Sequence, residues 1–204
     1  MTNNNKYPTL QKAKAALSDA AQVNPGNWVP HSEYTALACK NIAERCQDMD
    51  SDKAYILGLL HDIGRYVGIV KEKHQIEGYR YCMERGWNDV ARICLTHCHA
   101  TKDVTKSVGK WDVPQEDFEF SKKYIETVEF DDYDRLVQLS DCLAMPTGFC
   151  MVEKRFIDVA LRYGVNQYSV EKWKKTIELK EYFDGKTGCS IYTLLPGIIE
   201  NSLT

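Results

Sequence analysis

Residues 54–64 read Ala54-Tyr-Ile-Leu-Gly-Leu-Leu-His61-Asp62-Ile-Gly64, an apolar run that ends on two ionisable side chains. A helix over residues 53–63 would be apolar on every side, so we expect it to be central and buried. His61 and Asp62 at its end are then delivered into the interior, where an unpaired carboxylate costs on the order of several kcal/mol. A divalent cation would compensate for the charge of Asp62 directly. Gly64 would release the chain from the helix so that both side chains converge.

The rest of the chain also has helical periodicity, and no run of alternating residues predicts a strand. We expect an all-α fold, with Thr9 capping a first helix and Pro30 opening a second. Gly109 and Pro114 indicate a loop over residues 100–114, and the apolar tail after Gly188 should pack back on the helices. Without repeats or linkers, residues 1–204 predict a single domain. The other expected helices cover residues 53–63, 74–86, 87–99, 115–127, 132–144, 149–163 and 170–182.

Composition excludes several classes of protein. Hydrophobic residues make up 44% of the 204 residues and charged residues 27%, which are ordinary globular values. Lys and Arg number 26 against 29 Asp and Glu, a net charge of −3, so we expect no nucleic-acid partner. The chain has no apolar run long enough for a membrane span and no signal peptide at its start. The eight cysteines are therefore expected to be free thiols in the cytoplasm.

Further ionisable groups share apolar helix faces with the residues around them. Asp141 lies between Val137 and Ala144 in the predicted 132–144 helix, and His97 shares a face with Ile93. Each alone is more often a satisfied core residue than a ligand. Two buried carboxylates and several imidazoles on separate helices, however, match the way in which helical bundles hold metal ions.

The order His31, His61-Asp62 and Asp141 resembles the signature of the HD superfamily of metal-dependent phosphohydrolases, and His61-Asp-Ile-Gly-Arg65 resembles its HDIG variant. The resemblance covers about residues 30–145. It implies an HD-domain helical bundle with a metal site in its core, and His61 and Asp62 as catalytic residues. One divalent ion would be held by His31, His61, Asp62 and Asp141.

Two more histidines suggest a second ion. In HD proteins with two metals, histidines at sequence positions similar to those of His74 and His97 bind the second ion. Asp62 would then bridge the two ions. The resemblance then implies a water or hydroxide between the ions as the nucleophile. Imidazole and carboxylate ligands suit Mn, Fe, Co, Ni or Zn. His74-Gln75 and His97-Cys-His99 also resemble elements of the HD-GYP phosphodiesterases, but the GYP element is missing, so cyclic dinucleotide hydrolysis is not supported.

Residues next to the motif are candidates for binding substrate. Arg65 could pair with a phosphate, and Lys102 could reach the same anion from the loop after His97. His99 is turned about 200° from His97 on an ideal helix, so it is an extra ligand only if the helix ends first. The alternative for His99 is an exposed polar residue. Cys94 and Cys98, four residues apart, are typical of small core residues rather than of a zinc cluster.

The sequence thus predicts a metal-dependent phosphohydrolase, a phosphomonoesterase or phosphodiesterase, that acts on a small phosphate ester or nucleotide. Two alternatives stay open. An HD-type diiron oxygenase acting on a phosphonate or polyol would use the same metal ligands. A non-catalytic sensor module would keep only the fold.

Overall fold

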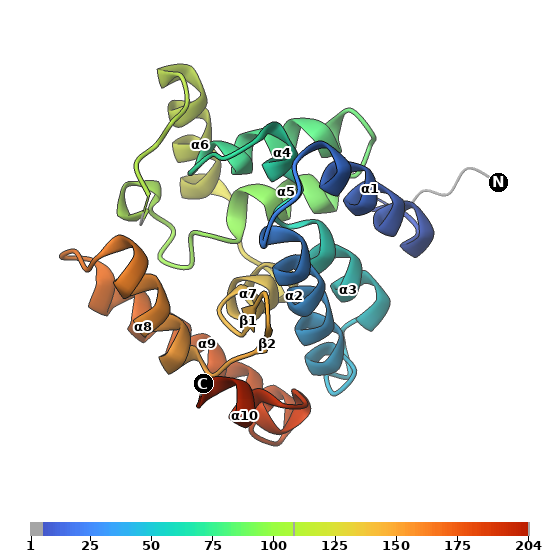
Figure 1. Ribbon diagram of the computed structural model, residues 1–204, viewed down its shortest axis with the longest axis vertical. Helices are drawn as coiled ribbons and strands as arrows, with labels where there is room; N and C mark the ends of the chain where they lie inside the picture. The colour runs from blue at the N-terminus through green and yellow to red at the C-terminus, as the bar shows by residue number, and fades with distance from the viewer. Residues whose placement is uncertain (1–5, 108, 204) are drawn as a thin grey trace.

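The computed structural model describes residues 6–107 and 109–203, and this part of the chain is almost entirely helical (Figure 1). Ten α-helices, three short 3-10 helices and one two-stranded hairpin make up these residues, which confirms the predicted all-α class. The first five residues and Val108, within the expected 100–114 loop, lie outside the described residues. The elements are α1 (Leu10–Val23), α2 (Trp28–Ala43), α3 (Ser51–Leu60), η1 (Ile63–Val67), α4 (Lys73–Met83), α5 (Asn88–Thr96), η2 (Val104–Lys106), α6 (Gln115–Thr127), α7 (Asp132–Asp141), β1 (Ala144–Met145), β2 (Gly148–Phe149), α8 (Val152–Tyr163), α9 (Ser169–Thr187), η3 (Ile191–Leu194) and α10 (Ile198–Ser202).

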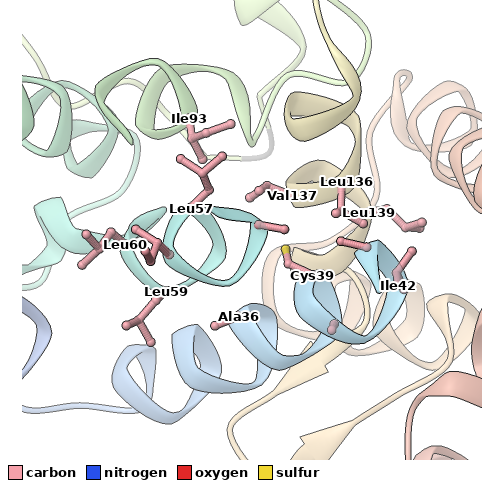
Figure 2. Packing of buried hydrophobic residues seen from close by; sticks show 14 of the residues in the cluster. Ala36, Cys39, Ile42, Leu57, Leu59, Leu60, Ile93, Leu136, Val137 and Leu139 are labelled. Atoms are coloured by element: carbon pink, nitrogen blue, oxygen red, sulfur yellow. The ribbon is translucent and has the colours of Figure 1, made fainter. Parts of the chain in front are cut away.

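Helix α3 is central, as its apolar composition predicts. It packs against α1, α2, α5 and α7, so every side of it meets another helix. Figure 2 shows Leu57 and Leu60 of α3 among side chains of α2, α5 and α7. Both leucines are at most 1% exposed. The cap is Asp50, whose carboxylate accepts hydrogen bonds from the first backbone amides of the helix. Close packing on all sides therefore fixes the position of the end of α3.

Helix α7 is shorter than the predicted 132–144 helix. It ends at Asp141, so this residue lies at the end of the helix rather than in its middle. The chain then turns through the β1–β2 hairpin, in which Ala144 pairs with Phe149. Pro146 cannot continue a helix and disfavours helical backbone in Met145, which agrees with the hairpin that takes the place of the last predicted helical turn.

Other predicted boundaries are wrong by one to five residues. Helix α2 begins at Trp28, two residues before Pro30, and α5 ends at Thr96 rather than at His99. Helix α8 begins at Val152 instead of Phe149, because Phe149 belongs to β2. Helix α9 runs on to Thr187 and ends where Gly188 adopts a left-handed conformation.

The C-terminal segments pack back on the helical core, as predicted. Ile191, Leu195 and Ile198 are buried, and their elements contact α2, α9 and β2. All eight cysteines are free thiols, which confirms that prediction. Within the described residues, none of the helices has the length and apolar content needed to cross a membrane.

Candidate metal centre

The His61–Asp62 pair stands where α3 ends. His61 caps the helix in near-helical conformation, and Asp62 leaves it with φ −103° and ψ 13°. His61 is 1% exposed and Asp62 3% exposed, so both ionisable groups are buried, as the apolar helix requires. The change of backbone conformation between them sends the two side chains into the same interior space.

Gly64 has a role different from the expected one, because α3 has already ended at Leu60. A Cβ atom at Gly64 would overlap the carbonyl oxygen of His74 and the backbone nitrogen of Gly78. The glycine therefore allows η1 and α4 to approach backbone to backbone. This approach brings His74, in the first turn of α4, against Asp62.

One group of candidate ligands joins α2, α3 and α7. His31 Nε2 lies 2.9 Å from Asp141 Oδ1, and the ring centroids of His31 and His61 are 5.4 Å apart. Potential ligand atoms of His31, His61 and Asp141 all lie within 4.8 Å of one another. Residues that are far apart in sequence thus meet at one point of the interior.

A second group surrounds Asp62. Asp62 Oδ1 lies 3.2 Å from His74 Nε2 and 3.6 Å from His97 Nε2, and the two imidazole nitrogens are 3.4 Å apart. His61, Asp62 and His97 also have potential ligand atoms within 4.8 Å of one another. His61 belongs to both groups and so connects them. The six residues predicted as metal ligands are therefore brought together.

Backbone carbonyls orient the four imidazoles of these groups. A carbonyl oxygen only accepts a hydrogen bond, so each ring must donate its Nδ1–H and keep the Nε2 lone pair for the site. Metal-binding histidines are commonly held by such a bond from their other ring nitrogen. The pairs are His31 with Ala144 (3.2 Å), His61 with Gly58 (2.7 Å), His97 with Ile93 (3.0 Å) and His74 with Lys71.

The pKa values of His61, His74 and Asp62 agree with this ligand chemistry. Burial lowers the pKa of His61 to about 4 and that of His74 to about 3, so both rings are neutral at pH 7. Burial raises the pKa of Asp62, but the charge of Arg65 and the interactions with the neighbouring histidines outweigh it and hold that pKa well below its usual value. Burial opposes protonation of His97, whereas Cys98 and Asp62 raise its pKa well above normal. Without a cation, His97 thus keeps a proton beside Asp62, and a metal ion bound at its Nε2 would displace that proton.

Two buried atoms of the site have no hydrogen-bond partner among the described residues: His61 Nε2 and Asp62 Oδ1. Each such atom costs about 1–3 kcal/mol, and more when the group is charged. Both atoms are electron-pair donors that face neighbouring imidazoles and carboxylates. A divalent cation satisfies such donors, so the residues present fit a metal ion.

Two arginines flank the candidate ligands. Arg65 Nε donates to Asp62 Oδ2 at 2.5 Å, and Arg155 Nη2 lies 3.6 Å from Asp141 Oδ1. Arg155 belongs to α8 and also pairs with Asp158 at 3.3 Å. Arg155 was not predicted from the sequence. The one sequence feature that could have pointed to it is a polar stripe of Arg155, Asp158 and Arg162 along one face of α8. The sequence does not indicate which part of the molecule that face packs against.

A cavity of about 1150 Å³ opens onto the site. It is lined by His31, Asp62, His74, His97 and Asp141, and by the cationic side chains of Arg65, Lys71, Lys110, Arg155 and Arg162. Glu72 and Asp158 also line it, so the wall carries carboxylates as well as these five cationic side chains. The cationic side chains offer partners for an anionic molecule that reaches the candidate ligands.

His99 and Lys102 lie apart from the ligand groups. The predicted exposure of His99 is wrong, because it is 1% exposed, bonded to Gln75 at 2.8 Å and stacked on Trp111. Helix α5 does end before His99, but the ring faces Gln75 and joins none of the ligand groups. Lys102 Nζ lies 3.7 Å from Glu129 and is not part of the cavity wall.

The predicted core role is correct for Cys94 and wrong for Cys98. Cys94 is fully buried, with its sulfur 3.6 Å from the carbonyl oxygen of Leu60. Cys98 is only partly buried and lines the cavity. Its sulfur, His74 and His97 form a third group of potential ligand atoms within 4.8 Å. The two cysteines diverge because α5 ends between them.

A comparison with protein families matches residues 11–120 to a model described as the HDOD domain. The matched range includes His31, His61, Asp62, His74 and His97, whereas Asp141 and Arg155 follow it. Searches of curated proteins and of solved structures gave no significant match.

Proposed function

Because the chain belongs to the HDOD domain family, whose members have an HD-like helical fold, we propose that it is a metal-dependent phosphohydrolase acting on a small phosphate ester or nucleotide. One observation supports this activity above all others. Four imidazoles, each held by a backbone carbonyl through Nδ1, direct Nε2 at the buried Asp62 and the partly buried Asp141, beside a cavity with several cationic side chains on its wall.

The ligand groups suggest two cations. His31, His61, Asp62 and Asp141 would hold the first, and His74 and His97 the second, with Asp62 shared between them. Bound divalent cations would supply a hydrolytic nucleophile at neutral pH and neutralise charge on a phosphoryl group. Imidazole and carboxylate ligands favour Mn, Fe, Co, Ni or Zn.

The chain's own contribution is to bind and orient the substrate. Arg155 lies beside Asp141 and faces the cavity, so its planar guanidinium can hold phosphoryl oxygens next to the ligand groups. Arg65 is held on the other side by Asp62. The cavity exceeds the ~300–1,000 Å³ of typical small-molecule sites, which favours a nucleotide-sized substrate over a very small ester.

The cavity also indicates how much of the chain belongs to the functional domain. Its wall combines residues of the matched range with Asp141 and Arg155 beyond that range. We therefore treat residues 1–204 as one functional domain. Eight free thiols favour a reducing compartment, and we place the reaction in the cytoplasm.

A regulatory role is the second candidate, since HDOD domains often serve as regulatory modules. The ion pair between Arg65 and Asp62 favours it, because an arginine can neutralise a buried carboxylate without a cation. An iron-dependent oxygenase could use the same ligands. Consumption of O₂ would distinguish it from the hydrolase and from the regulatory module. Hydrolysis of a phosphate ester under anaerobic conditions with Mn²⁺ supports the hydrolase.

Metal quantification on the full chain, purified without chelators, tests the proposal together with a panel of phosphate esters. His97→Ala and His99→Ala form a matched pair, because both histidines are buried but only His97 Nε2 faces Asp62. We expect wild type and His99→Ala to hold two ions and hydrolyse at least one ester, and His97→Ala to lose about half of its metal. A wild-type protein without bound metal or phosphatase activity would instead favour the regulatory role.

A further inference from the structure

The two proposed cation sites differ in their supply of ligands. The first has His31, His61, Asp141 and the shared Asp62, whereas the second has only His74 and His97 besides the shared carboxylate. A fourth protein ligand at the second site would match the coordination that transition-metal ions commonly have. Cys98 is a nearby donor. Its sulfur and one ring nitrogen each of His74 and His97 lie within 4.8 Å of one another.

The backbone explains why Cys98 faces the site. Helix α5 ends at Thr96, and His97 is its cap. Cys98 follows in the turn after the helix and lines the cavity, together with His97. Cys94, one helical turn earlier, stays in the apolar core with its sulfur toward Leu60. The end of α5 thus separates a core thiol from a thiol at the candidate metal centre.

A buried oxygen atom next to His74 and His97 also favours a bound cation at this place. Asp62 Oδ1, 3.2 Å from His74 and 3.6 Å from His97, is buried and lacks a hydrogen-bond partner among the described residues. Its side chain is 4% exposed. A carboxylate oxygen without a hydrogen-bond partner therefore faces the same two imidazoles that Cys98 accompanies, so a cation bound by these imidazoles would have the Asp62 oxygen and the Cys98 sulfur as its nearest further donors.

We propose that Cys98 is a thiolate ligand of the second cation, together with His74, His97 and Asp62. This inference rests on the proposed function, because it assigns one more ligand to that metal centre. Binding breaks the Cys98 S–H bond, forms a sulfur–metal bond and releases the proton to water. A thiolate shifts the preference of the second site toward softer ions such as Zn²⁺, Fe²⁺ or Co²⁺ and away from Mg²⁺ and Ca²⁺. The two sites would then differ in the metal that they select.

Cobalt titration of the full chain, freed of metal beforehand, tests the assignment. Thiolate–Co²⁺ bonds give a charge-transfer absorption that imidazole and carboxylate ligands do not give. We expect this absorption in the wild type, saturating at one sulfur-bound ion per chain. Cys98→Ser should lose it and bind the second ion about tenfold or more weakly, since loss of even outer-shell partners costs ~10–100-fold in affinity. Cys94→Ala, the matched control four residues away, should keep the absorption.

Alkylation of the wild-type protein gives a second readout that needs no variant. Zn²⁺ should protect Cys98 from a thiol reagent, as followed by peptide mass spectrometry, while the partly buried Cys189 should react equally with and without Zn²⁺. Bound cobalt without charge-transfer absorption, an absorption that survives in Cys98→Ser, or unprotected Cys98 would overturn the assignment and leave the metal centre standing. Failure of the wild type to bind any cobalt would overturn both the Cys98 assignment and the proposed metal centre.

Discussion

The two walls of the cavity are built in different ways. The wall around α3 is closely packed, with Leu57, Leu59 and Leu60 each at most 1% exposed, and it carries His61 and Asp62. The wall formed by α8 packs mainly against α9, and of its twelve residues only Val152 is buried. In Figure 1 the pair α8–α9 lies to one side of the α2–α3–α7 core.

This difference indicates that the two walls have different functions, metal binding at α3 and substrate binding at α8. Metal ligands need fixed positions, and they stand on elements that packing holds on all sides. Arg155, proposed to bind the substrate, stands on a helix with large apolar side chains exposed, among them Ile157 at 61% and Leu161 at 83%. Elements with few buried contacts open locally at low free-energy cost. We infer that α8 moves more readily than α3 as ligands enter and leave.

The largest effect is expected from removing a carboxylate on the α3 wall. Asp62→Ala should abolish binding of both ions and lower hydrolysis by about 1,000-fold or more, since a single electrostatic contact to the reacting group is already worth ~10²–10³-fold. Metal content and initial rates measure this. Asp158→Ala removes a carboxylate of the same cavity from the α8 wall and should keep both ions. Full metal occupancy in Asp62→Ala would refute the shared-ligand role.

The packing contrast predicts the next largest effect. Leu57→Ala leaves a cavity in the core around α3 and should lower the free energy of unfolding by about 2–5 kcal/mol. Leu161→Ala on α8 should change it by less than ~0.5 kcal/mol, because that side chain is mostly in solvent. Urea unfolding of the two variants measures both values. Similar losses would mean that α8 is packed as tightly as α3.

The α3 wall was largely predictable from the sequence. An apolar helix that ends on His61-Asp62 is a local pattern, and burial of both groups follows from it. The apolar face around Asp141 predicts its place near the site in the same way, although its helix ends earlier than periodicity indicates. The class of fold therefore follows from patterns within single helices, whereas the set of six candidate ligands comes from the resemblance to the HD superfamily.

The other parts of the site depend on contacts between distant segments. The position of Arg155 follows from the docking of α8, which no residue of α8 encodes locally. Rotation on a continuing helix predicts an exposed His99, but α5 ends at Thr96 and Gln75 from α4 holds the ring in the interior. Cys98 was assigned to the core for the same reason. Errors thus gather where a helix ends and the chain changes direction.

Arg155 tests the role of the α8 wall. Arg155→Gln should raise KM for a phosphate ester by about 10–100-fold, because a hydrogen bond to a charged group is worth ~1.5–3 kcal/mol. Metal content should stay unchanged, and kcat should fall by less than KM rises. Arg135→Gln, an arginine outside the cavity that pairs with Asp132, should leave KM unchanged. Loss of metal in Arg155→Gln would show that this arginine supports Asp141 rather than the substrate.

The smallest effect is expected at Lys102, which belongs to neither wall. Its ammonium lies near Glu129, a side chain 94% exposed, and such surface pairs contribute about 0–1 kcal/mol. Lys102→Ala should therefore leave metal content unaltered and change KM by less than about twofold, because no contact with the site is lost. Steady-state kinetics beside Arg155→Gln measures this. A rise in KM as large as that of Arg155→Gln would mean that the loop after His97 closes over bound substrate, and that the cavity has a third wall with a mobility of its own.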